Sequence, residues 1–176
     1  MFESVQSFDT DALHAMNHWF PASTDVFWLA VTKTITWIPL YAVLVERLYR
    51  RSSLEVFVKR LALVALGVLL WDQGAEFFKH WVERPRPCKT MDDLRVLVHC
   101  SDYGFFSAHA ANAFGLAFLF RKWLHQSWFP VLSIIAVVQS FSRIHLGVHY
   151  PTDLLVGGLW GFLISFVLHK IEKTWS

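Results

Sequence analysis

The sequence is poor in charge and in cysteine, and each shortage excludes a class of protein. Charged residues make up 17% of its 176 residues, against about 25% in a typical soluble domain. The net charge is +2 and the basic residues follow no single stripe, which argues against a nucleic-acid-binding protein. Two cysteines are too few for a disulfide scaffold or a structural zinc site. The H-E-x-x-H motif of zinc proteases is also absent.

The sequence is instead rich in apolar residues. Hydrophobic residues reach 55%, including 16 Phe and 9 Trp. Three segments without Asp, Glu, Lys or Arg (103–120, 123–142 and 154–169) are each close to the length of a helix that crosses a bilayer. Two earlier apolar segments have similar length but contain charges. A soluble helical bundle is the competing interpretation, and five apolar segments in so short a chain argue against it.

These segments predict an all-α fold, a polytopic membrane helical bundle in a single domain over residues 1–176. We expect the transmembrane bundle within 26–170 and an N-terminal interfacial helix within 1–22, where apolar residues recur at helical spacing. The outer loop is expected over 81–106. The five expected transmembrane helices cover residues 26–46, 58–80, 107–124, 128–147 and 152–170.

Lys and Arg residues in the loops predict the orientation of this bundle. The first 32 residues contain none, so we expect the N-terminus outside and the C-terminus inside. Nine of the 16 basic residues then lie on the cytoplasmic side: Arg47, Arg50, Arg51, Lys59, Arg60, Arg121, Lys122, Lys170 and Lys173. The outer loop breaks the rule locally, because it carries Arg84, Arg86, Lys89 and Arg95. Such an exception suggests a function for this loop.

Three separate segments deliver polar side chains to the outer face. Lys79 and Arg86 follow the second helix, Ser107 begins the third, and Arg143 ends the fourth. Arginine matches phosphate oxygens as a bidentate donor, and a serine cap leaves helix amides free for an anion. One such cation alone would be a contact to lipid headgroups. The set favours a phosphate site.

The same face holds residues suited to phosphoryl transfer. Asp153 lies one helical turn after His149 and can orient its imidazole for attack. His109, on another helix, can protonate the leaving oxygen. His145, His149 and Asp153 also form H-x3-H-x3-D, a candidate metal face, but a proline interrupts it and nearby arginines repel a cation. We therefore expect no metal, and we assign His145 no role.

Three motifs of this sequence resemble the signatures of the type 2 phosphatidic acid phosphatase family: Lys79-x6-Arg86-Pro87, Ser107-Ala108-His109 and Ser142-Arg143-x5-His149-x3-Asp153. The first and third match in full. The second departs from the family's P-S-G-H, because Phe106 and Ala108 replace proline and glycine. Ala108 still offers its backbone N–H to a phosphate.

The resemblance implies a role for each matching residue. His149 would be the nucleophile that forms a phosphohistidine, Asp153 would orient it, and His109 would be the general acid. The phosphate would be held by Lys79, Arg86, Ser107, Ala108 through its N–H, and Arg143. No cofactor is implied.

The resemblance also implies a bacterial inner-membrane lipid phosphatase whose site faces the periplasm or the exterior. We expect undecaprenyl diphosphate as the substrate, with phosphatidylglycerophosphate or lipid A as alternatives. A non-enzymatic membrane structural protein is the alternative from another class. We expect membrane lipids around the protein, no nucleic acid and no obligatory protein partner.

Two further predictions concern pairs of residues. Cys88 and Cys100 share the outer loop, where disulfides persist, so we favour a bridge over two free thiols. Charges within a bilayer are costly and usually pair. We therefore expect Lys33 to pair with Asp72 or Glu76, and the alternative is that Lys33 reaches the headgroups.

Overall fold

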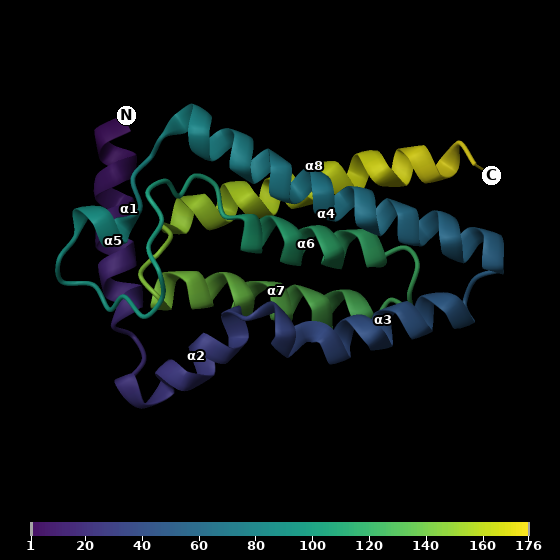
Figure 1. Cartoon of the computed structure of the whole chain (residues 1–176), viewed down its shortest axis with the longest axis horizontal. Coiled ribbons are helices and arrows are strands. Elements are labelled where there is room, and N and C mark those ends of the chain that lie inside the picture. Colours follow the sequence, from purple (N-terminus) through teal and green to yellow (C-terminus); the bar gives the residue numbers. More distant parts are fainter. Residues whose placement is uncertain (1, 176) are drawn as a thin grey trace.

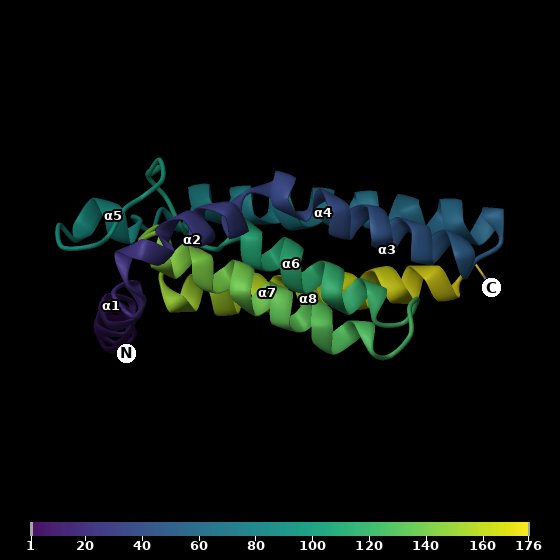
Figure 2. The same cartoon turned by 90° about the horizontal axis from the view of Figure 1, so that it is seen from below.

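The computed structural model describes residues 2–175 and the side chains of residues 5–175, and all its regular elements there are helices. Met1 and Ser176, the ends of the predicted domain, lie outside the described residues. The long helices run alongside one another in Figures 1 and 2: α3 (Ile38–Arg50), α4 (Leu54–Val82), α6 (Ala108–Phe120), α7 (Trp128–His145) and α8 (Pro151–Lys173). The shorter elements are α1 (Phe2–Asn17), η1 (Ala22–Thr24), α2 (Asp25–Thr32), η2 (Thr34–Trp37) and α5 (Pro87–Thr90).

Helices α6 and α8 form the centre of the bundle because glycines let their backbones approach closely. A Cβ atom added to Gly161 would lie 2.3 Å from the carbonyl oxygen of Ala111, and one added to Gly157 would lie 2.5 Å from that of Ser107. Small residues serve helix packing in membranes in this way. The contact places the beginning of α8 directly against the beginning of α6.

The first expected transmembrane helix, over residues 26–46, is wrong as a single straight helix. The chain breaks into α2, η2 and α3, and the two arms are bent by 71°. Pro39 lies in the first turn of α3. A proline has no N–H to donate, and its ring would clash with the carbonyl four residues earlier if the helix continued through it. Side chains satisfy carbonyls at the end of α2: Thr36 donates to Ala30 at 2.6 Å and the Trp37 indole donates to Val31 at 2.7 Å.

The predicted pairing of Lys33 with Asp72 or Glu76 is also wrong. Lys33 lies at the break after α2 and is exposed, and among the described residues it forms no ion pair with either carboxylate. Asp72 instead accepts from the Asn112 amide at 2.7 Å. Glu76 binds the Lys79 ammonium at 3.1 Å.

The other expected helices appear with shifted ends: α4 is longer at both ends, and α6 is shorter. By length and composition, α8 is the helix of the described residues that could span a membrane on its own. The segment from Ala22 to Arg50 passes the same test only as a bent pair. The number of spans therefore stays a prediction.

Helix α1 lies across one end of the bundle, beside α5 and the long loop (Figure 1). The C-terminus and the α3–α4 and α6–α7 connections lie at the opposite end. The α4–α6 loop and the beginnings of α6 and α8 lie at the α1 end.

Candidate active site

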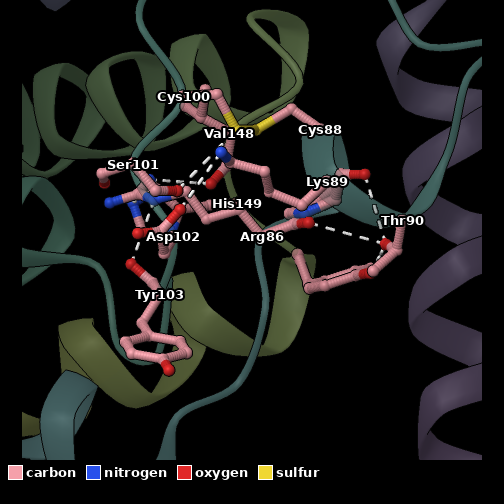
Figure 3. The surroundings of a disulfide bond; sticks show 12 residues. Arg86, Cys88, Lys89, Thr90, Cys100, Ser101, Asp102, Tyr103, Val148 and His149 are labelled. Carbon is pink, nitrogen blue, oxygen red and sulfur yellow. Dashed lines mark hydrogen bonds and ion pairs between the residues drawn. A yellow bond between two sulfur atoms is a disulfide. The ribbon is translucent and has the colours of Figure 1, made fainter.

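The loop between α4 and α6 folds back on itself and so positions Arg86. Pro85 and Tyr103 form an antiparallel bridge, with Arg86 N donating to Asp102 O at 3.1 Å and Gly104 N donating to Arg84 O at 3.0 Å. Just beyond this bridge, Cys88 and Cys100 form a disulfide. Figure 3 shows the disulfide close to Arg86 and His149.

His149 and Asp153 form a buried pair at the junction of α7 and α8. His149 Nδ1 lies 3.2 Å from Asp153 Oδ2, and the two residues are 2% and 0% exposed. An ionised carboxylate only accepts hydrogen bonds, so Nδ1 carries the proton. The other nitrogen, Nε2, therefore carries no proton and can accept a hydrogen bond.

Arg86 donates a hydrogen bond to that nitrogen. Its Nη1 lies 3.1 Å from His149 Nε2 and also donates to Val148 O at 2.9 Å, while Nε donates to Tyr103 O at 3.0 Å. Burial lowers the pKa of the Arg86 guanidinium, and the charges of Asp153 and Glu76 oppose that shift. The guanidinium stays charged, since the reference value is far above neutral. The unprotonated imidazole nitrogen thus accepts from a positive group.

Burial also decides the charge of His149. It lowers the pKa of His149 to about 4, although the hydrogen bond to Asp153 and the charge of Asp153 raise it in part. Arg86 and Arg143 lower it further. His149 is therefore neutral at physiological pH, as a nucleophile must be.

Ser107 joins the start of α6 to this pair. Its hydroxyl accepts from Ala110 N at 3.4 Å as an N-cap, and its own N–H donates to Asp153 O at 3.1 Å. Ala108 is the first residue of α6, and N–H groups in a first turn lack partners within the helix. The positive end of α6 is thereby placed next to the first turn of α8.

Arg143 and His109 approach the site from α7 and α6. Arg143 Nη1 donates to the hydroxyl of Thr32. The Arg143 Nε atom is buried, and within the described structure it has no hydrogen-bond partner. His109 and Thr32 line one cavity of about 470 Å³, which also borders Asp72 and Asn112. Arg143 therefore has a donor left for a ligand.

The structure directly joins four of the predicted site residues, namely Arg86, Ser107, His149 and Asp153. The Lys79 ammonium is bound to Glu76 on its own helix. The candidate metal face does not form, because His145 Nε2 contacts Asp25 Oδ1 at 2.9 Å. Among the described residues, no group of three or more His, Cys, Asp or Glu side chains could hold a metal ion.

Sequence reasoning missed two residues at this site, Arg84 and Asp9. Arg84 Nη1 donates to Asp153 Oδ1 at 2.9 Å, and Arg84 Nη2 binds Asp9 Oδ2 at 2.6 Å. A signal for Arg84 existed, because it is one of the basic residues that break the charge rule in the outer loop. Asp9 carries no such signal in a tail with several acidic residues.

The remaining basic residues of the outer loop also have partners. Lys89 binds Asp102 at 3.1 Å, and Arg95 binds Asp25 at 3.1 Å. The local excess of positive charge is thus used for ion pairs at the α1 end of the bundle.

Comparison with known proteins identifies the family of the chain. The model of the PAP2 superfamily matches residues 57–176, which include every residue of the three motifs. The chain belongs to the PAP2 superfamily. PAP2 proteins related to this chain are named phosphatases, and the protein is a lipid phosphatase.

Three similar proteins show which kinds of PAP2 phosphatase this chain resembles. A lipid A 4'-phosphatase of Bacteroides thetaiotaomicron is 31% identical over 97% of this chain and 81% of its own length. An undecaprenyl-diphosphatase of Sulfolobus acidocaldarius is 30% identical over 85% of this chain and 69% of its own. The structure of a transmembrane PAP2-type phosphatidylglycerolphosphate phosphatase from Bacillus subtilis superposes with a TM-score of 0.72 at 24% identity, covering 97% and 87% of the two chains. The PAP2 chain is therefore a membrane protein with the fold of that phosphatase.

Proposed function

We propose that this protein transfers the phosphate of a membrane lipid to His149 and then to water. The observation that carries the proposal is the unprotonated nitrogen of His149, Nε2, which Asp153 orients and to which Arg86 donates. A phosphate oxygen that accepts from Arg86 in its place frees Nε2 to attack. Nε2 attacks phosphorus as the bond from phosphorus to the lipid oxygen breaks, which gives a phosphohistidine. Water then attacks phosphorus and releases inorganic phosphate and free His149.

The other predicted residues complete this reaction. His109 gives a proton to the leaving oxygen and takes one from the attacking water. Arg86 and Arg143 supply positive charge to the phosphoryl oxygens, whose charge must be stabilised in transfer. The α6 N-terminus at Ser107 and Ala108 offers N–H groups to the same oxygens. Lys79 adds a further cation.

We propose a lipid A-type phosphate ester as the substrate. The support is the alignment with the Bacteroides lipid A 4'-phosphatase, which runs along nearly the whole chain. More than half of the residues that line the cavity beside His109 are aliphatic or aromatic, and these come from α3, α4 and α6, which suits a lipid chain. Undecaprenyl diphosphate is the second candidate, supported by the undecaprenyl-diphosphatase relative. The site would face the periplasm or exterior from the inner membrane.

The test is phosphate release by purified protein in detergent from lipid A, undecaprenyl diphosphate and phosphatidylglycerophosphate. We expect the highest kcat/KM on lipid A, and an unchanged rate in saturating chelator. His149→Ala should abolish release, whereas His125→Ala, which alters an exposed histidine of the α6–α7 connection, should not. Substrate labelled with ³²P should leave acid-labile label on the wild-type protein and none on His149→Ala. Turnover by His149→Ala would refute the mechanism, and preference for another lipid would refute only the substrate.

A further inference from the structure

One face of α1 is buried although the helix lies at the edge of the molecule. Asp9, Leu13 and Asn17 are all 0% exposed. They are spaced four residues apart, so they share one face of the helix. A buried carboxylate in such a helix needs partners, since an unpaired charge is costly to bury.

The partners of Asp9 come from two elements of the active site. Its Oδ2 accepts from Arg84 Nη2 at 2.6 Å and from the Thr152 hydroxyl, and its Oδ1 accepts from Thr152 N at 3.0 Å. Thr152 immediately precedes Asp153 in the first turn of α8. Asp9 therefore binds the backbone next to the carboxylate that orients His149.

Arg84 connects the two carboxylates. One arm of its guanidinium binds Asp9, and the other donates to Asp153 Oδ1 at 2.9 Å and to Thr152 Oγ1 at 2.9 Å. The guanidinium lies 4.0 Å from the centre of the Tyr150 ring. Stacking and two charged hydrogen bonds leave the planar group little freedom.

This arrangement fixes the rotation of the Asp153 carboxylate. Arg84 holds Oδ1, while Oδ2 accepts from His149 Nδ1 and from Tyr150 N at 3.0 Å. Both oxygens are therefore committed. Loss of Asp9 would leave Arg84 with one carboxylate and Thr152 N–H without its acceptor.

The far end of α1 is fixed as well. The Asn17 amide donates to His145 O at 2.8 Å and to Ile144 O at 3.0 Å, and its oxygen accepts from Arg95 N at 2.8 Å. The helix is thus anchored to the end of α7 at one point and to the start of α8 at another. It connects the two helix ends that flank His149.

We propose that Asp9 and Arg84 are positioning residues of the phosphatase reaction: α1, through Asp9 and Arg84, holds Asp153 in the orientation that directs His149 at phosphorus. Neither residue touches the reacting atoms. The inference rests on the proposed roles of His149 and Asp153.

The first test is Asp9→Asn, with Asp11→Asn as the matched control, because Asp11 is an exposed carboxylate on the same helix. Misplaced catalytic groups cost up to about 100-fold in rate. We expect Asp9→Asn to lower kcat by roughly 10–100-fold with little change in KM, and Asp11→Asn to leave both unchanged. Wild-type kcat in Asp9→Asn would overturn the proposal.

The second test separates positioning from folding. Arg84→Gln leaves two buried carboxylates without their shared cation, so its Tm in detergent and its kcat should both fall. Arg84→Gln combined with Asp9→Asn removes one of those charges and should recover part of the Tm, while kcat stays low because Asp153 remains unheld. If kcat recovers together with the Tm, Arg84 acts only on folding and the proposal fails.

His149→Ala in the same series tests the nucleophile separately. Turnover by this variant would refute the proposed function without deciding the role of Asp9.

Discussion

At the scale of single residues, burial and pairing act on His149 in opposite directions. Burial disfavours the imidazolium, and the Asp153 carboxylate favours it. Burial dominates, since the pKa falls from 6.5 to about 4. His149 therefore stays uncharged well below neutral pH. In the proposed mechanism, Asp153 acts by orienting the imidazole more than by raising its basicity.

This balance predicts the pH dependence of the reaction. The acid limb of kcat/KM should lie near pH 4 instead of near pH 6.5. Because Asp153 raises the pKa of His149, Asp153→Asn should lower the rate and move the acid limb to still lower pH. A pH–rate profile of both proteins checks this. An acid limb near pH 6.5 would contradict the buried environment.

The same shift has a consequence for stability, with a definite sign. The folded-state pKa of His149 lies below its ordinary value, so folding favours the neutral form. The stability that this group contributes is complete above about pH 6.5 and is lost as the pH falls toward 4.

At the scale of elements, the contact between α6 and α8 sets the geometry of the site. Ser107 begins one helix, Asp153 lies in the first turn of the other, and a backbone hydrogen bond of 3.1 Å joins them. Gly157 and Gly161 allow this approach. Any group inserted between the helices should separate phosphate-binding from nucleophilic residues.

Gly161→Ala tests this contact. Its Cβ would lie 2.3 Å from a backbone oxygen of α6, so the helices must move apart, at a cost of about 1–3 kcal/mol. Gly158→Ala is the control, because its Cβ meets only the Phe114 side chain, at 3.1 Å. We expect Gly161→Ala to have a lower Tm and a lower kcat than the wild-type protein, and we expect neither change for Gly158→Ala. Equal Tm values for the two variants would contradict the close packing.

The disulfide is the second feature at this scale. It joins residues 12 apart in sequence, in the loop that carries Arg86. Cross-linking a loop of this size stabilises a fold by about 3 kcal/mol in the chain-entropy account. Replacing Cys88 and Cys100 together by Ala should lower the Tm and weaken phosphate binding. Alkylation of the untreated protein followed by mass spectrometry should find no free thiol, and two alkylated cysteines would rule the bridge out.

At the scale of the whole molecule, charge and apolar surface are arranged for a bilayer. Large side chains such as Ile134, Leu155 and Leu159 are more than half exposed along the bundle. The α3–α4 connection, the α6–α7 connection and the C-terminus lie at one end (Figure 1). Together with the helix ends beside them, they carry nine of the 16 basic residues. Positive charge favours the cytoplasm, so we infer that the active site faces outward.

Reporter fusions test this orientation. Green fluorescent protein at the C-terminus should fluoresce, because it folds in the cytoplasm, and alkaline phosphatase at the same point should be inactive. Alkaline phosphatase inserted after Asp93, in the outer loop, should be active. The reversed pattern would place the site inside.

Local patterns predicted the helices and the motif residues, and they failed where distant segments decide the structure. The apolar runs located α4, α6, α7 and α8, although the ends of these helices are shifted. The break before α3 was missed, although Pro39 was a local signal for it. The contact between Asp9 and Arg84 joins residues 75 apart, and no spacing rule connects two such positions.

The position of Asp9 has an evolutionary consequence. The match to the family covers residues 57–176, so Asp9 lies outside it while its partner Arg84 lies inside. Loss of Arg84 leaves the buried carboxylate of Asp9 without its cation until Asp9 changes as well. We therefore expect positions 9 and 84 to be inherited as a pair. A chimera that takes its N-terminal helix from a relative should be active only if the outer loop comes from the same parent.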